Sequence, residues 1–336
     1  MDSLTHIAIG AVIGEACAGK AIGKRAMLIG AVLQSIPDID FVAAFFLSPT
    51  ANLIAHRGLT HSLLFGVIVT FTIGYFFGRW KRFQSLSFKQ WLTFAGIEIF
   101  IHLLLDACNA YGVGWFEPFS QDRIAFNLIF VADPFYSVWL GIAFIMLWVL
   151  PSGHQFRPRW VEFGLLISSC YLCLNIINKN VVSTELKKTL ASKKVDHNRF
   201  FTTPTAFNNL LWYCVVESDS GYHIGYRSVF DESESIKLTY FPRKRELLSG
   251  IEEDDELGNL LQFSQGYYTV EKTTDALVFN DLRFGLVAGW EGNKNEFTFH
   301  YFLQRPGKNI LVVQRGRFAE WNFRTMKSMA QRINGE

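Results

Sequence analysis

The sequence His56-Arg57-Gly58-Leu59-Thr60-His61-Ser62 runs directly into an apolar segment that ends near Trp80. Two histidines, an arginine and two hydroxyl groups therefore lie where the chain is expected to enter a membrane. Imidazole groups five positions apart, across a glycine, can turn toward one metal ion or a pair of ions. The arginine between them offers a planar fork for a phosphate or a carboxylate. This stretch predicts a polar site at a membrane boundary.

The composition divides the chain into an apolar part and a polar part. Half of the 336 residues are hydrophobic, 18% are charged, and the mean hydropathy of +0.17 is high for a soluble protein. Long apolar runs continue to about residue 178, after which the charge is ordinary and the apolar runs are short. We expect a membrane α-helical bundle over 1–178, a basic connector over 179–195 and a strand-rich soluble α+β domain over 196–336.

Charge and cysteine content exclude two classes of protein. The formal net charge is +2, and no basic stripe with interleaved aromatic residues occurs, so we expect no nucleic-acid partner. Of the five cysteines, only Cys214 lies in the polar half. That half therefore cannot contain an internal disulfide, and the odd count argues against a disulfide-stabilised fold.

Six apolar runs predict about six membrane spans. They cover approximately 4–18, 26–47, 62–78, 91–107, 133–150 and 160–177. The first run follows Asp2 and Ser3, either of which can cap a helix. It contains Gly10-Ala11-Val12-Ile13-Gly14, a spacing of small residues that allows close helix contact in membranes.

The distribution of Lys and Arg predicts the orientation of these spans. With the N-terminus outside, nine basic residues lie in the inner loops, and the outer loops hold only Arg57 and Arg123. The C-terminal domain would then lie on the outer, periplasmic side. Five lysines after the sixth run disagree with this assignment, but long domains are translocated largely regardless of charge.

Polar residues interrupt several of the apolar runs. They are His6 in the first run, Asp38 and Asp40 in the second, and His102 and Asp106, one helical turn apart, in the fourth. Each interruption also has a purely structural explanation. His6 could lie at an interfacial helix end, Asp38 and Asp40 could be solvated carboxylates at a kink, and His102 and Asp106 could form a pair within one helix. Unpartnered carboxylates in apolar surroundings are costly, however, and ionisable residues in membrane segments commonly mark functional sites.

The predicted orientation brings these polar residues and the His56–Ser62 stretch to the same side of the membrane, where they can hold a divalent metal. Histidines with aspartates suit one or two ions, most simply Zn²⁺. The expected metal ligands are His6, Asp38, His56, His61, His102 and Asp106. We expect Asp40 to act as a ligand or proton acceptor, and Arg57 to stabilise an anionic transition state. Asp2 and Asp133 are secondary candidates, although Asp133-Pro134 is typical of a helix start.

The polar half of the chain has the pattern of a β-rich domain. Seven runs rich in β-branched and aromatic residues predict strands. They are Leu211–Glu217, Tyr222–Phe230, Ile236–Tyr240, Tyr267–Glu271, Ala276–Asp281, Glu296–Leu303 and Ile310–Val313. Asp281 and Arg283 are expected to form a local ion pair.

The motifs of the apolar half occur in the order seen in one protein family. They are Met1-Asp2-Ser3-Leu4-Thr5-His6, Pro37-Asp38-Ile39-Asp40, the His56–Ser62 stretch, His102-Leu103-Leu104-Leu105-Asp106, the Tyr111-Gly112 and Pro118-Phe119-Ser120 loop, and Asp133-Pro134. In these the chain resembles the YdjM family, described as membrane-bound metal-dependent hydrolases of bacterial inner membranes. A weaker resemblance extends through the second half, most specifically at Asp281-Leu282-Arg283-Phe284-Gly285. The resemblance implies a metal-dependent hydrolase.

A metal site at the outer boundary of the bilayer favours a phosphoesterase. Its substrate would be a phospholipid or a lipid-linked phosphate. Two other classes remain open: a transporter or proton or ion pathway, which also uses intramembrane Asp and His, and a non-catalytic membrane protein with a structural metal. Clustering at one side favours a site over a pathway, because the fifth and sixth runs supply almost no polar groups.

Overall fold

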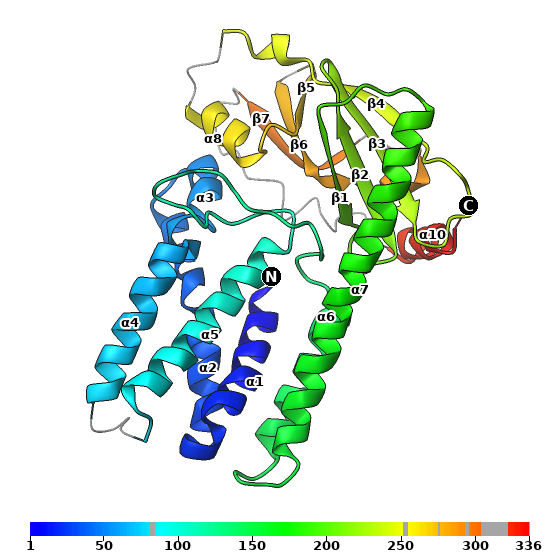
Figure 1. Cartoon of the computed structure of the whole chain (residues 1–336). Helices are drawn as coiled ribbons and strands as arrows, with labels where there is room; N and C mark the ends of the chain where they lie inside the picture. Colours follow the sequence, from blue (N-terminus) through cyan, green and yellow to red (C-terminus); the bar gives the residue numbers. More distant parts are fainter. Residues whose placement is uncertain (81–84, 251–254, 275, 293–295, 304–321, 336) are drawn as a thin grey trace. The chain divides into compact units, whose positions relative to one another are not determined.

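The computed structural model describes residues 1–80, 85–250, 255–274, 276–292, 296–303 and 322–335. The chain forms two compact units, which are labelled by element in Figure 1. The first unit contains Met1–Ala43 and Ala55–Asn175, and the second contains Ala44–Ile54 and Ile176–Glu336. The predicted strand Ile310–Val313 lies outside the described residues.

The first unit is built of helices. They are α1 (Ser3–Ile22), α2 (Arg25–Ser35), η1 (Pro37–Phe45), η2 (Leu59–His61), α4 (Leu63–Arg79), α5 (Phe88–Ala107), α6 (Pro134–Val149) and the first part of α7 (Arg157–Ser192). Side-chain caps begin several of them: Asp2 accepts from Thr5 N at α1, and Ser62 accepts from Phe65 N at α4. These caps fix where each helix starts next to the polar stretches.

Small residues allow α1 and α2 to pack closely. A Cβ atom added at Gly14 would overlap the carbonyl oxygen of Ala26, and one at Gly30 would overlap that of Gly10. The two helices therefore run side by side in opposite directions, as Figure 1 shows. This close contact places the beginning of α1, with His6, near the end of α2.

A buried ion pair joins α1 to the start of α7. The Arg157 guanidinium donates to both carboxylate oxygens of Glu15, at 2.7 and 2.6 Å, and it also donates to the carbonyl oxygens of Leu147 and Leu150. A charged pair with this many hydrogen bonds is tolerated in apolar surroundings because its polar atoms are satisfied.

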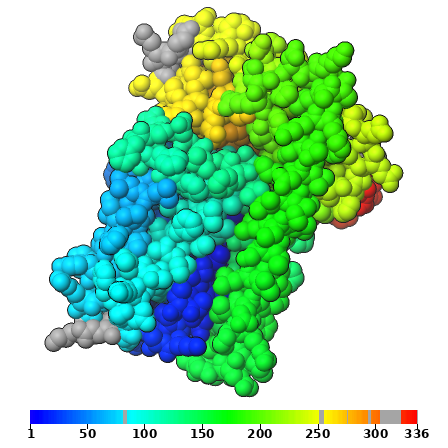
Figure 2. Space-filling model, in the orientation of Figure 1, coloured from blue at the N-terminus to red at the C-terminus, as the bar shows by residue number. Residues whose placement is uncertain are grey.

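The outward faces of α4 and α6 are apolar. Exposed side chains on them include Val67, Ile68, Phe71, Phe76, Val138, Ile142, Ile145, Trp148 and Val149. In Figure 2 the cyan surface belongs to α4 and α5. Exposed apolar side chains of this kind are expected where a helical unit contacts lipid.

Fewer than six spans meet the criteria of length and composition. Within the described part of the chain, α5 and α7 qualify alone, and two bent pairs raise the number to four: α2 with η1, and Pro49–His61 with α4. The predicted six spans are thus not confirmed. The helix α6 has only 16 residues, about 24 Å at the usual helical rise, and α1 carries two charged residues, Glu15 and Lys20.

The second unit contains two antiparallel sheets. The first has the order β1-β2-β3-β4 and the second β5-β6-β7. Their strands are β1 (Arg199–Pro204), β2 (Leu211–Glu217), β3 (Gly221–Ser228), β4 (Thr239–Pro242), β5 (Tyr268–Lys272), β6 (Leu277–Leu286) and β7 (Phe297–Leu303). The short helices are α3 (Pro49–Ala55), η4 (Arg245–Leu248), α8 (Asp255–Phe263), η5 (Gly289–Glu291) and α10 (Phe323–Ile333). Six predicted strand regions are confirmed, and β1 was not predicted.

Successive side chains of β2 point to opposite faces of the first sheet, and both faces are buried. Trp212, Cys214 and Val216 pack against the second part of α7, including Val182 and Leu186. On the other face, residues of β2 such as Tyr213 and Val215 share a core with residues of β6 and β7. The sheet therefore lies between a helix and a second sheet, which explains why every residue of β2 is buried.

Candidate metal centre

Four side chains from three helical segments bring potential metal ligands together. Asp38 comes from η1, His61 from η2, and His102 and Asp106 from α5. One ligand atom from each lies within 4.8 Å of all the others. His61, His102 and Asp106 are buried, and Asp38 is partly exposed. Two imidazoles with two carboxylates form a donor set that suits Zn²⁺ or a related divalent ion.

The shortest distance in this group joins the two histidines. The Nε2 atoms of His61 and His102 lie 3.1 Å apart. Asp38 Oδ1 is 3.5 Å from the first and 3.6 Å from the second. Asp106 Oδ2 lies 3.3 and 3.7 Å from the same two nitrogens. All four donor atoms thus face a single point.

Hydrogen bonds on the far side of each ring set which nitrogen faces the group. His102 Nδ1 donates to the backbone carbonyl oxygen of Gln34 at 2.6 Å, so Nε2 of the neutral ring carries a lone pair. His61 Nδ1 lies 3.4 Å from Asp40 Oδ2 and 3.1 Å from Thr60 Oγ1. With a proton on Nδ1 of each ring, all four converging atoms are acceptors. Acceptors facing one another repel, so the arrangement fits a bound cation.

Arg57 lies beside this group and is held on several sides. Its Nε is 3.1 Å from Asp106 Oδ2, its Nη1 donates to Asn109 Oδ1 at 2.8 Å, and its guanidinium lies 5.1 Å from the ring centroid of Tyr111. Its backbone N–H donates to Asp40 Oδ2 at 2.7 Å. Arg57 has a φ of 60°, a conformation that is costly outside glycine and often found at functional sites.

Of two further predicted ligands, His6 contacts the group and His56 contacts Asp40, and neither belongs to the group. His6 Nε2 lies 3.2 Å from Asp106 Oδ1, and its ring stacks on His102 with centroids 4.0 Å apart. Among the described residues, His6 Nδ1 has no hydrogen-bond partner. His56 Nδ1 lies 3.2 Å from Asp40 Oδ1, and its side chain is 40% exposed. These histidines therefore surround the four-donor group.

The two secondary candidates act as helix caps. Asp2 accepts from the backbone and side chain of Thr5 at 3.0 and 2.6 Å. Asp133 accepts from Phe135 N at 2.9 Å and from the Tyr171 hydroxyl at 2.8 Å. Neither carboxylate is part of the four-donor group.

Gln34 was not recognised in the sequence as part of the site. Besides its carbonyl contact with His102, its side chain can donate to Glu98 Oε2 at 2.9 Å and accept from His102 N at 3.3 Å. Gln34 and Glu98 are both fully buried. A buried amide and a buried carboxyl in two apolar runs were the signal that could have indicated this contact.

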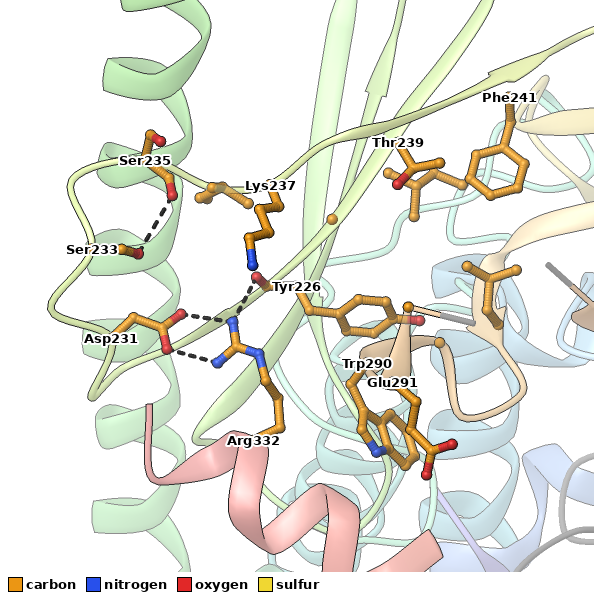
Figure 3. Close-up of a pocket in the computed structure, with 16 residues that line it drawn as sticks. Tyr226, Asp231, Ser233, Ser235, Lys237, Thr239, Phe241, Trp290, Glu291 and Arg332 are labelled. Carbon is orange, nitrogen blue, oxygen red and sulfur yellow. Dashed lines mark hydrogen bonds and ion pairs between the residues drawn. The ribbon is translucent and has the colours of Figure 1, made fainter. Parts of the chain in front are cut away.

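The second unit contains a separate pocket of about 330 Å³, shown in Figure 3. Asp231 and Arg332 both line it and form two hydrogen bonds with each other, at 2.6 and 2.8 Å. Arg332 also donates to the carbonyl oxygen of Tyr226 at 3.1 Å. These charged groups satisfy one another, so the pocket lacks the converging acceptors of the metal centre.

The predicted local pair of Asp281 and Arg283 is also present, at 2.6 Å.

Comparisons with known proteins agree on a family. The family model described as YdjM inner membrane protein matches residues 1–182. The Escherichia coli K12 inner membrane protein YbcI is 30% identical over 158 residues, which are 45% of this chain and 83% of that protein. Bacillus subtilis 168 YfhP is 26% identical over 302 residues, 84% of this chain and 87% of that protein. No solved structure matches. Because the family model covers more than half of its residues, the chain belongs to the YdjM inner membrane protein family.

Proposed function

We propose that this protein is a metal-dependent hydrolase of the bacterial inner membrane that acts on a phosphoester. The observation that carries the proposal is the convergence of four donor atoms within 4.8 Å, with the Arg57 guanidinium next to them. Phosphoester hydrolysis needs an activated water and positive charge near the developing anion. A cation site beside a fixed guanidinium supplies both requirements in one place.

Each residue has a role in this proposal. Asp38, His61, His102 and Asp106 would hold the ion, most simply Zn²⁺. A divalent ion bound there supplies Lewis acidity and activates water at neutral pH. Asp40 orients His61 or accepts its proton, because it lies 3.4 Å from Nδ1. Arg57 stabilises negative charge on the substrate.

The position of the group in the helical unit supports a lipid substrate. Asp106 lies at the end of α5, and His61 lies immediately before α4, so the group is at one end of these helices. The helical segments would cross the membrane as six spans, with this end and the C-terminal unit on the periplasmic side. A site at the membrane boundary can take a phospholipid headgroup or a lipid-linked phosphate without extracting the lipid.

The test uses the full chain purified in detergent. Mixed micelles containing phosphatidylglycerol, phosphatidic acid or a polyprenyl diphosphate serve as substrates, and release of phosphate or headgroup is measured. We expect hydrolysis of at least one of these lipids, its loss after chelation, and its return when Zn²⁺ is restored. Absence of hydrolysis by the metal-loaded protein, or equal hydrolysis by metal-free protein, would contradict the proposal.

A metal that only holds the helices together predicts a different result. In that case His102→Ala would lower the thermal stability, and no lipid would be hydrolysed by the unsubstituted protein. Measuring stability and hydrolysis on the same preparations separates the two functions. A transporter would require uptake or release of an ion by reconstituted vesicles without substrate turnover.

A further inference from the structure

The second unit has a cleft whose position is defined by the ends of several strands. It has a volume of about 500 Å³, within the usual size range of small-ligand sites. Arg199 at the start of β1 and Glu217 at the end of β2 are register partners. Arg243 follows β4, and Tyr268 begins β5. All four residues line the cleft.

One glutamate holds two of the arginines in place. Arg199 Nε donates to Glu217 Oε2, and Arg243 Nη2 donates to Glu217 Oε1. The guanidinium of Arg199 lies 4.1 Å from the ring centroid of Tyr267, and that of Arg243 lies 4.9 Å from that of Tyr222. Both cations are therefore fixed before any ligand binds, which lowers the entropy that binding costs.

Positive charge exceeds negative charge in the part of the cleft lining that the structure describes. That part contains three arginines and one glutamate. The third arginine, Arg245, is exposed, and its side chain makes no hydrogen bond or ion pair with any residue that the structure describes. Burial raises the pKa of the Tyr268 hydroxyl, and the positive charges of Arg245 and Arg243 oppose this rise. The cleft thus attracts an anion.

Part of the cleft wall is apolar, and a glycine leaves room for one cation. Leu248, Leu257 and Leu261 belong to this apolar part. Gly266 has a φ of 79°, and a Cβ atom added there would lie 2.9 Å from Arg199 Nη2. A ligand that fits this lining carries an anionic head and an apolar body.

We propose that this cleft binds a phosphate group attached to an apolar substituent, as in the headgroup region of an anionic phospholipid. Guanidinium groups match phosphate oxygens with paired N–H donors, and they remain charged at any physiological pH. The apolar wall accommodates the substituent next to the phosphate. The inference does not depend on the proposed hydrolase, because every residue that carries it belongs to the second unit.

The experiment measures binding to the full chain in detergent after treatment with a chelator, so that turnover at the metal centre cannot consume the probe. Isothermal titration calorimetry is done with dihexanoyl phosphatidic acid, dihexanoyl phosphatidylcholine and inorganic phosphate. We expect phosphatidic acid to bind most tightly. Arg245→Gln should weaken it about tenfold or more, the usual loss when a charged hydrogen bond is removed.

Lys244→Gln is the matched control, because it removes a neighbouring positive charge that does not line the cleft. Its affinity for phosphatidic acid should equal that of the unsubstituted chain. Arg243→Gln provides a second test inside the cleft. Equal binding of phosphatidylcholine or inorganic phosphate, no binding at all, or equal losses in Lys244→Gln and Arg245→Gln would overturn the proposal. Repeating the titration with His102→Ala separates this result from any failure of the hydrolase proposal.

Discussion

The Nε2 atoms of His61 and His102 lie 3.1 Å apart although the residues are 41 positions apart in the chain. The Nδ1–H of His102 is directed at the carbonyl oxygen of Gln34. With the proton of His61 on Nδ1, which lies 3.4 Å from Asp40 Oδ2, two lone pairs face each other near the carboxylates of Asp38 and Asp106. A cation between these four atoms would replace their mutual repulsion with attraction.

Arg57→Gln tests whether the guanidinium acts in catalysis. We expect the variant to keep its metal, because Arg57 is not a ligand, and to hydrolyse phospholipid about 10²- to 10³-fold more slowly, a loss typical of removing one group that stabilises an anionic transition state. The measurement is the turnover number at saturating lipid. Arg79→Gln, at the exposed end of α4, is the control. Unchanged turnover in Arg57→Gln would remove this residue from the mechanism.

Asp40→Asn tests whether the Asp40 carboxylate orients the His61 ring for metal binding. Asp40 lies near His61 Nδ1 and accepts from the backbone of Arg57. Loss of a carboxylate behind a metal-binding histidine usually lowers metal affinity about 10- to 100-fold. Competition with a chromophoric chelator measures this change. Asp122→Asn, in an exposed turn with Ser120, should bind metal normally, and an equal affinity of the two variants would argue against the assigned role.

The polar motifs and the metal-ligand character of their side chains could be predicted from the sequence, whereas the way the motifs meet in space could not. The His56–Ser62 stretch and the His102–Asp106 pair stand out because polar residues interrupt apolar runs. Sequence spacing could not show that His61 approaches His102 while the His56 side chain remains 40% exposed. The positions of the two rings depend on how the chain turns from η2 into α4 and on how α4 packs against α5. The amide of Gln34 and the carboxyl of Glu98, each in an apolar run, hinted at their contact, but no side-chain pattern could show that the Gln34 backbone carbonyl accepts from His102.

The fold, like the site, could be predicted in part from the sequence. Alternating and aromatic runs identified six of the seven strands, but β1 was missed although Phe200, Phe201, Thr202 and Thr203 have strand-forming side chains. Hydropathy identified the apolar runs and overestimated the number of clear spans. The kink that the sequence offered as an alternative at Asp38 and Asp40 is present as a bend of 54° between α2 and η1, but hydropathy could not give its angle.

Gly14→Ala tests the close contact of α1 with α2. The added methyl group would overlap the backbone of Ala26, and overpacking of this kind typically costs about 1–3 kcal/mol. The midpoint of thermal unfolding in detergent should fall. Gly141→Ala in α6 is the matched control, since a Cβ atom there meets nothing within 4 Å. A fall of the same size in both variants would contradict the packing argument.

The orientation of the chain can be tested with cysteine labelling. In a chain whose five cysteines are replaced by serine, Glu232→Cys lies on the second unit and Lys89→Cys lies at the start of α5. We expect an impermeant maleimide added to cells with a permeabilised outer membrane to label Glu232→Cys and to leave Lys89→Cys unlabelled until the inner membrane is opened. The reverse pattern would place the second unit in the cytoplasm.

The most direct measurement is the metal content of the purified, folded chain. Elemental analysis of the unsubstituted protein should find about one equivalent or more of a divalent metal per chain, as expected for a site with four protein ligands. The double variant His61→Ala/His102→Ala should lose it, and His154→Ala, outside the four-donor group, should retain it. A folded chain without metal, or an equal metal content in all three proteins, would contradict the account.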